Sequence, residues 1–207
     1  MITVFGGQTS RSLRVVWLME EMGLPYRVRP VDMLSDVEDT EFLAANPAGY
    51  IPVMQDGDVT MVESIAIMEY LMARYGPTPL APAPHDPNFS AYQQFLHLGE
   101  AGLATLMMPV VVSRFIAPKA ERENWGASWC LQSFQKRLKL VSQRLASSPY
   151  LAGEAFTAAD ISVTYALNLG QRNCGITLGD AEQAYLARTT GRDAYKRSME
   201  RSHEGVS

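Results

Sequence analysis

The chain has few cysteines, no long apolar run and no excess of basic residues, and each shortage excludes a class of protein. Cys130 and Cys174 lie far apart and outside any motif, so we expect two free thiols rather than a disulfide framework or a metal site. No continuous apolar run approaches the roughly 18 residues that suggest a membrane span. Eighteen Lys and Arg against 22 Asp and Glu give a formal net charge of −4, which argues against a nucleic-acid partner.

The N-terminal sequence MITVFGGQTSR also lacks the basic flank, long apolar stretch and cleavage site of a secretory signal. We therefore expect a cytoplasmic protein whose mature chain begins at Met1. Hydrophobic residues make up 47% of the 207 residues and charged residues 19%, which is an ordinary globular balance. This length suits two modest domains, each large enough to bury a core.

Residues 1–77 alternate between short strand patterns and helix patterns. We predict strands at 2–5, 26–31, 51–55 and 59–62, the last two forming a hairpin around Asp56-Gly57, and helices at 13–24, 39–45 and 64–74. The predicted order is βαβαββα. The helix at 13–24 is apolar over nearly its whole circumference, so we expect a sheet to cover one side and a second domain the other.

Five prolines within residues 76–88 can sustain neither a helix nor a sheet ladder. We therefore place a linker at 78–88, between a first domain at 1–77 and a second at 89–207. The second domain shows no strand-like alternation. It shows helical patterns at about 88–117, 121–146, 161–169 and 180–200, with a capping box formed by Thr157 and Asp160 before the third. The predicted fold is an α/β domain followed by an all-α domain.

A first candidate for chemistry is the turn between the first strand and the first helix, where Thr9, Ser10, Arg11 and Ser12 follow one another. Backbone N–H groups at a helix start lack intrahelical partners, and the positive helix end favours an anion. A hydroxyl here could donate a hydrogen bond to a thiolate. Taken alone, the same residues also fit a plain N-cap.

Two further segments could bind a peptide. In Asn46-Pro47-Ala48-Gly49-Tyr50-Ile51-Pro52, a cis bond before Pro52 would turn the Ile51 N–H and C=O outward, free to pair with an extended peptide. At Glu63-Ser64, which starts a helix directly after a strand, Ser64 could hold a carboxylate and Glu63 an ammonium group. Each segment alone also has a structural explanation, as an edge-strand proline and as a helix cap.

In this order, the three segments resemble the glutathione-binding domain of bacterial cytosolic glutathione transferases of the serine type, similar to the theta and beta classes. The run RSLRVVWLMEEMGLPY from Arg11 to Tyr26 looks like the first helix and second strand of such proteins. The run from Asn46 to Met54 looks like their Asn-Pro-x-Gly-x-x-Pro segment. The resemblance covers essentially the whole chain and implies a thioredoxin-like domain with a mixed sheet, followed by an all-helical domain.

The resemblance also implies a catalytic hydroxyl about four residues before the arginine of the first helix. Counting back from Arg14 reaches Ser10, with Thr9 as the second choice and Ser12 as the third. The hydroxyl, the helix end and Arg11 together would stabilise the glutathione thiolate. In this role the serine is a hydrogen-bond donor and not a nucleophile.

By the same resemblance, Ile51 pairs its backbone with the cysteinyl part of glutathione, and Pro52 is cis. Glu63 and Ser64 hold the γ-glutamyl amine and carboxylate. Many relatives have a lysine or arginine where this chain has Tyr50. A phenol offers one hydrogen bond to the glycyl carboxylate but no charge, so the affinity for glutathione could be weaker.

The co-substrate implied is glutathione, without a metal, and the second substrate is a small hydrophobic electrophile, in keeping with detoxification. We expect an apolar pocket between the domains, with Leu103, Met107 and Tyr165 as candidate lining residues, although each fits a core position as well. The resemblance further implies a homodimer.

Two alternatives stay open: a noncatalytic glutathione-binding or protein-interaction scaffold, and a glutathione-dependent peroxidase or isomerase. The lack of a cysteine in the first-helix turn lowers the case for thiol-disulfide chemistry.

Overall fold

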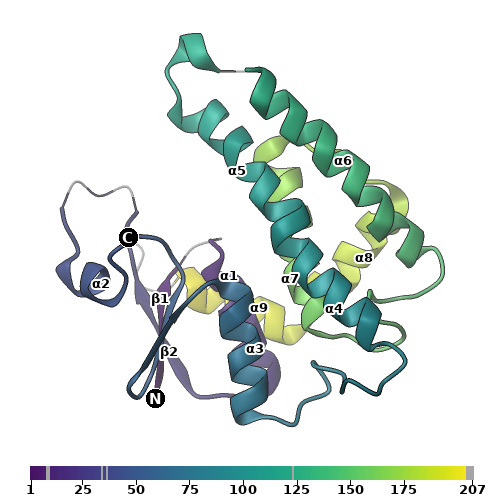
Figure 1. Cartoon of the computed structure of the whole chain (residues 1–207), viewed down its shortest axis with the longest axis horizontal. Helices are drawn as coiled ribbons and strands as arrows, with labels where there is room; N and C mark the ends of the chain where they lie inside the picture. The colour runs from purple at the N-terminus through teal and green to yellow at the C-terminus, as the bar shows by residue number, and fades with distance from the viewer. Residues whose placement is uncertain (8–9, 34, 36, 123, 204–207) are drawn as a thin grey trace. The chain divides into compact units, whose positions relative to one another are not determined.

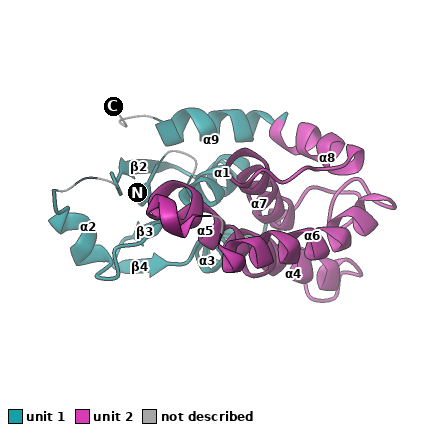
Figure 2. Cartoon of the chain, turned by 90° about the horizontal axis from the view of Figure 1, so that it is seen from above, with its two compact units in different colours: residues 1–78, 191–207 teal, residues 79–190 magenta. Residues whose placement is uncertain are grey.

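The computed structural model divides the chain into two compact units, coloured separately in Figure 2. Unit 1 consists of Met1–Thr78 together with Gly191–Ser207, and unit 2 of Pro79–Thr190. The residues that the structure describes are 1–7, 10–33, 35, 37–122 and 124–203. The C-terminal segment therefore groups with the N-terminal unit, whereas the sequence analysis placed it in the helical domain.

Unit 1 contains a four-stranded mixed sheet in the order β2-β1-β3-β4, of which Figure 1 labels β1 and β2. The strands are β1 (Ile2–Gly6), β2 (Tyr26–Pro30), β3 (Val53–Asp56) and β4 (Val59–Val62), and the helices between and after them are α1 (Ser12–Met22), α2 (Thr40–Ala45) and α3 (Ser64–Tyr75). Strands β1 and β2 are parallel, while the β1–β3 and β3–β4 pairs are antiparallel. The predicted order βαβαββα and the mixed sheet are confirmed.

Helix α1 is buried along its first two turns, from Ser12 to Met19, and ends at Gly23 in the left-handed conformation with φ 65°. Its apolar circumference is covered by β1, α3 and the C-terminal helix α9 (Asp193–His203). Helix α9 lies within residues 89–207, which the sequence analysis assigned to the second domain, but it groups with unit 1. Sequence periodicity shows that a helix is covered but not which distant segment covers it.

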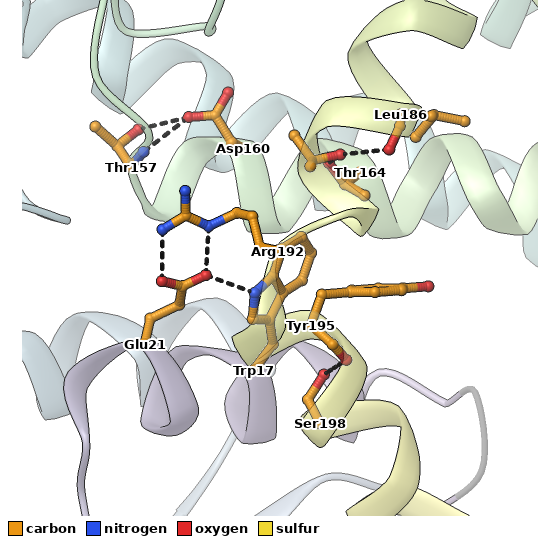
Figure 3. A network of polar contacts seen from close by, with 10 residues as sticks. Trp17, Glu21, Thr157, Asp160, Thr164, Leu186, Arg192, Tyr195 and Ser198 are labelled. Carbon is orange, nitrogen blue, oxygen red and sulfur yellow. Dashed lines mark hydrogen bonds and ion pairs between the residues drawn. The ribbon is translucent and has the colours of Figure 1, made fainter.

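The contact between α1 and α9 is both aromatic and ionic (Figure 3). The rings of Trp17 and Tyr195 meet edge to face, with centroids 4.8 Å apart. The Glu21 carboxylate accepts hydrogen bonds from Trp17 Nε1 at 3.0 Å and from Arg192 at 2.6 and 2.7 Å. Because Glu21 is largely buried and its partner Arg192 binds both carboxylate oxygens, this pair fixes α9 on α1 more firmly than an exposed ion pair could.

In the described part of unit 2 the regular elements are helices, joined by loops, one of which holds an isolated β-bridge between Tyr150 and Gly153. The helical elements are α4 (Phe89–His97), η1 (Leu98–Ala104), α5 (Thr105–Val111), η2 (Val112–Ile116), η3 (Lys119–Glu121), α6 (Trp125–Leu145), α7 (Ala158–Cys174) and α8 (Asp180–Thr190). Helix α7 is the core helix and packs against α4, η1, α5 and α8. At Gly99 the approach is so close that a Cβ atom would lie 2.3 Å from Ser162 Oγ, which itself donates to Leu96 O.

The helical segment Phe89–Ile116 is long and apolar enough to cross a membrane, judged by length and composition only. The sequence analysis, which considered uninterrupted apolar runs, did not identify it. Within unit 2 this segment packs against α7 and α6, and 44% of its most apolar window is buried. A core helix of a protein without membrane spans meets the same length and composition criteria.

Helix α7 begins with the predicted capping box, which is confirmed. The Asp160 carboxylate is fully buried and accepts hydrogen bonds from Thr157 N, Leu151 N and Tyr185 Oη at 2.8 to 3.0 Å, and from Thr157 Oγ1 at 3.2 Å. One side chain therefore joins the start of α7 to the preceding loop and to α8. Burial raises the pKa of this carboxyl to about 6, and the hydrogen bonds offset only part of that effect.

The raised pKa of Asp160 predicts a specific pH dependence of stability. Its pKa is about 6 in the folded chain and 3.8 in the reference state, so between these values the folded state binds the proton more tightly. Protonation of Asp160 therefore adds to the free energy of unfolding as the pH falls through 6, by about 1 kcal/mol between pH 7 and pH 5. Urea unfolding of the native chain and of Asp160→Asn at both pH values measures it. If the free energy of unfolding of the native chain, relative to that of Asp160→Asn, does not rise between pH 7 and pH 5, the assignment is contradicted.

Candidate glutathione site

The strand register brings the three candidate segments together at one end of the sheet of unit 1. Phe5 of β1 pairs with Val53 of β3, and Val53 pairs with Val62 of β4. Strands β1 and β4 run towards the end of the sheet beyond this row, and β3 runs away from it. The residues one position further towards that end are therefore Gly6 in β1, Pro52 before β3 and Glu63 after β4. The turn after β1, the segment before β3 and the start of α3 are therefore neighbours, although 57 positions separate the first from the last in the sequence numbering.

The turn after β1 holds two serine hydroxyls in contact. Ser10 Oγ lies 2.7 Å from Ser12 Oγ, and Ser12 Oγ accepts a hydrogen bond from Gly7 N at 3.0 Å. Ser10 is half-buried, whereas Ser12 is fully buried against Gly6, where a Cβ atom would lie 2.4 Å from Ser12 Cβ. Of the candidate hydroxyls that the structure describes, Ser10 is thus the one that a solvent-borne thiol can reach.

The remaining candidates in this turn have different positions. Thr9, the second choice for the catalytic hydroxyl, lies outside the described residues. Ser12, the third choice, has no exposed surface and therefore cannot touch a ligand directly. Arg11 is half-buried at the N-cap position of α1. Its positive charge therefore lies at the positive end of the helix, which itself favours an anion.

The loop before β3 is held by the side chain of Asn46, which is 7% exposed. Asn46 Oδ1 accepts from Ala48 N at 3.1 Å, and Asn46 Nδ2 donates to Tyr50 O at 2.7 Å. The Ile51-Pro52 bond is cis, as predicted. Among the described residues no hydrogen bond engages the backbone of Ile51, so its N–H and C=O are available to a ligand. The Tyr50 side chain is 72% exposed and is equally accessible.

Replacing Asn46 with aspartate is expected to weaken glutathione binding about tenfold, because the variant keeps the acceptor for Ala48 N but sets a carboxylate oxygen against Tyr50 O. Isothermal titration with glutathione measures the effect. Asn124→Asp is the matched control, since Asn124 caps α6 in unit 2 with one acceptor bond from Ala127 N and a donor bond to Glu121 O. Equal affinities of both variants for glutathione contradict a special role for the Asn46 loop.

The start of α3 presents a polar pair beside this loop. Glu63 has a φ of 70°, a conformation that a residue with a side chain rarely adopts and that often marks a functional position. Its side chain is exposed and makes no capping bond. Ser64 is buried, and its hydroxyl accepts a hydrogen bond at 3.3 Å from the guanidinium of Arg14, which has no exposed surface. Arg14 thus connects the helix that follows Ser10 to the residue pair at α3.

Comparisons with known proteins identify the family of the chain. Residues 10–74 match the family model of the glutathione S-transferase N-terminal domain. Glutathione S-transferase 4 of Zea mays is 30% identical over 152 residues, which cover 72% of this chain and 68% of that protein. The chain belongs to the glutathione S-transferase family. Glutathione S-transferase 3 of Schizosaccharomyces pombe is 29% identical over 185 residues, covering 84% of this chain and 76% of that protein.

A solved structure extends the match to the whole glutathione S-transferase fold. The theta class glutathione S-transferase of Xanthomonas axonopodis pv. citri, solved with glutathione bound, is similar with a TM-score of 0.80 and 27% identity, and the match covers 96% of each chain. The predicted fold class, a thioredoxin-like domain with a mixed sheet plus a helical part, is confirmed.

The three residues that we selected for the electrophile pocket of this glutathione S-transferase lie at core positions, the alternative that the sequence analysis left open for each of them. Leu103 and Met107 have no exposed surface, and Tyr165 on α7 is 7% exposed, so all three are core residues. Helical periodicity marked them as apolar but could not separate a core face from an open one. The same segment exposes other large apolar side chains to solvent, namely Met108, Val112, Phe115 and Ile116.

No group of three or more His, Cys, Asp or Glu side chains within the described part of the chain is arranged to hold a metal ion. Both cysteines are buried free thiols in unit 2. Burial raises the pKa of Cys174, which disfavours its thiolate form.

Proposed function

We propose that this glutathione S-transferase binds glutathione at the end of its sheet and activates the thiol, with Ser10 as the donor, for attack on small hydrophobic electrophiles. The observation that carries the proposal is the strand register, which sets Gly6, Pro52 and Glu63 side by side. A hydroxyl, a free peptide edge and an acidic residue are thereby gathered within the reach of one tripeptide.

The thiol of glutathione has a pKa near 8.5, so only a few per cent is ionised at neutral pH. Lowering this pKa by about 2 units takes about 2.7 kcal/mol of preferential stabilisation of the thiolate. The Ser10 hydroxyl supplies a donor for this, the positive end of α1 favours the anion, and Arg11 adds positive charge. The thiolate then forms a bond to the electrophilic carbon, and the leaving group departs with the electron pair of the bond that breaks.

The peptide part of glutathione fits the remaining groups. The Ile51 N–H and C=O pair with the cysteinyl residue as another strand would. Ser64, backed by the Arg14 guanidinium, holds the γ-glutamyl carboxylate, and Glu63 holds the ammonium group. Tyr50 donates to the glycyl carboxylate without adding a charge.

Replacing Glu63 with glutamine is expected to raise the Kd for glutathione about fivefold to tenfold, since the variant loses the charge that attracts the ammonium group. We expect kcat at saturating glutathione to stay the same, because Glu63 does not face the thiol. Glu154→Gln, which removes an exposed carboxylate of unit 2, is the matched control and is expected to bind like the native chain. A Kd for Glu63→Gln equal to that of the control contradicts the role.

Steady-state conjugation of glutathione to an activated aryl halide, followed by absorbance of the thioether, tests the proposed activity. A protein that binds glutathione but forms no conjugate supports the scaffold alternative. Turnover of a hydroperoxide in place of the aryl halide supports the peroxidase alternative. A homodimer, a cytoplasmic location and a role in detoxification stay predictions.

A further inference from the structure

Ser12 has a role that its burial alone would not suggest. Its side chain has no exposed surface, and its hydroxyl oxygen accepts a hydrogen bond from Gly7 N at 3.0 Å. The hydroxyl proton also needs an acceptor, because a buried donor without one costs free energy. Within the described part of the chain, the acceptor in contact with Ser12 Oγ is Ser10 Oγ at 2.7 Å.

This requirement fixes the direction of the bond between the two serines. If Ser10 donated to Ser12, the Ser12 proton would be left in the protein interior without an acceptor. If Ser12 donates, each of its hydrogen-bonding groups is used, and the proton of the half-buried Ser10 is free to turn towards solvent or a ligand. Ser10 Oγ then also accepts from Ser12 N at 3.4 Å, so its oxygen has two donors and its proton is directed outward.

We propose that Ser12 is a positioning residue for thiol activation, acting through a relay from Gly7 N–H to Ser12 Oγ–H to Ser10 Oγ–H and on to the glutathione thiolate. Each donor in such a chain polarises the next, so a Ser10 hydroxyl that accepts from Ser12 is a stronger donor than an isolated one. No proton is transferred along the relay, and only the strength and direction of the last hydrogen bond change. The inference rests on the proposed function, because it presumes that Ser10 faces the thiol.

The local fold supports this relay. Gly6 lacks a Cβ atom, and one built there would lie 2.5 Å from Ser12 Oγ. Only glycine at this position allows Ser12 to lie against the end of β1, where Gly7 N–H can reach it. The backbone bond from Leu13 N to Ser10 O, at 3.0 Å, holds Ser10 at the start of the helix.

The test is a double-mutant cycle on the apparent thiol pKa of bound glutathione, read from the ultraviolet absorbance of the thiolate against pH. Ser12→Ala is expected to raise that pKa by about half a unit and to lower kcat at neutral pH about 1.5-fold, while Ser10 is still present. In a Ser10→Ala background the same change is expected to have no further effect on the pKa. Ser198→Ala, which removes another buried hydroxyl of unit 1 that bonds a backbone carbonyl, is the control and should leave the pKa as in the native chain.

An unchanged pKa in Ser12→Ala overturns the relay, and so does a shift of equal size in both backgrounds. If Ser12→Ala does not fold, Ser12→Cys keeps a weak donor at the same place and should raise the pKa in the same direction; no shift in that variant overturns the relay as well. The two proposals fail in different ways. A native chain that does not lower the thiol pKa contradicts Ser10 activation itself, whereas a lowered native pKa that Ser12 substitutions leave unchanged contradicts the relay alone.

Discussion

Ser10→Ala is expected to lower the rate of conjugation at pH 7 and saturating glutathione by about 30-fold, because the bound thiol returns to a pKa near 8.5 and only a few per cent of it stays ionised. The variant keeps Ile51, Glu63 and Ser64, to which we assign the peptide part of glutathione, so glutathione should still bind. The loss should shrink as the pH rises through 8.5, where the thiol ionises without assistance. Initial rates between pH 6 and pH 9.5 measure both features.

Thr9→Ala provides the matched comparison, since Thr9 is the competing hydroxyl in the same turn. We expect less than a threefold loss for that variant, at every pH. If Thr9→Ala shows the large pH-dependent loss and Ser10→Ala does not, then Thr9 and not Ser10 donates to the thiolate. Equal small losses in both variants contradict activation by a side-chain hydroxyl in this turn.

Asp160→Ala is expected to lower the free energy of unfolding by about 4 kcal/mol, the largest stability effect of any single substitution considered. The substitution leaves Leu151 N, Thr157 N and Tyr185 Oη without their common acceptor in a site that water does not reach. Each such buried donor costs on the order of 1 to 3 kcal/mol. It also removes the negative charge at the positive end of α7.

Equilibrium urea unfolding, followed by circular dichroism, measures the loss of stability. Asp193→Ala is the control because Asp193 also lies in the first turn of a helix, but its side chain is 84% exposed and its partner is Lys196. That variant should lose less than 1 kcal/mol. If both variants lose a similar free energy of unfolding, the position of an acidic residue in the first turn of a helix explains the loss. That result contradicts the account of Asp160 as a buried acceptor that joins three segments.

Much of the fold is determined by local patterns, which is why the sequence predicted it. The hairpin around Asp56-Gly57 and the capping box of Thr157 and Asp160 each depend on residues close together in the chain. The cis bond before Pro52 was expected from the family resemblance and not from the local pattern. Turn chemistry and capping act over a few residues, so a reader of one sequence can identify them. The element order then followed from the alternation of strand and helix periods.

The features that the sequence did not reveal involve residues far apart or atoms in contact. The packing of α9 on α1 joins Arg192 to Glu21, and the site contact between Arg14 and Ser64 spans 50 residues. Periodicity says that a face is apolar, but the partner of that face depends on the tertiary fold. For the same reason Leu103 and Met107 could be identified as apolar but not as core residues.

Spacing from Arg14 ranked Ser10 before Ser12, but it could not show how the two hydroxyls of this turn are related. The structure separates them by exposure and by their mutual contact at 2.7 Å. A single sequence carries no information on whether two such side chains compete for one role or share it. Here the half-buried Ser10 can be reached from solvent, and the fully buried Ser12 lies behind it.

The most direct test of the account is the ionisation of glutathione bound to the native chain, measured as ultraviolet absorbance of the thiolate from pH 5 to pH 10. We expect an apparent thiol pKa of about 6.5, roughly 2 units below that of the free thiol. A bound thiol that titrates near 8.5, or no saturable thiolate signal at neutral pH, would contradict the claim that the end of this sheet binds and activates glutathione.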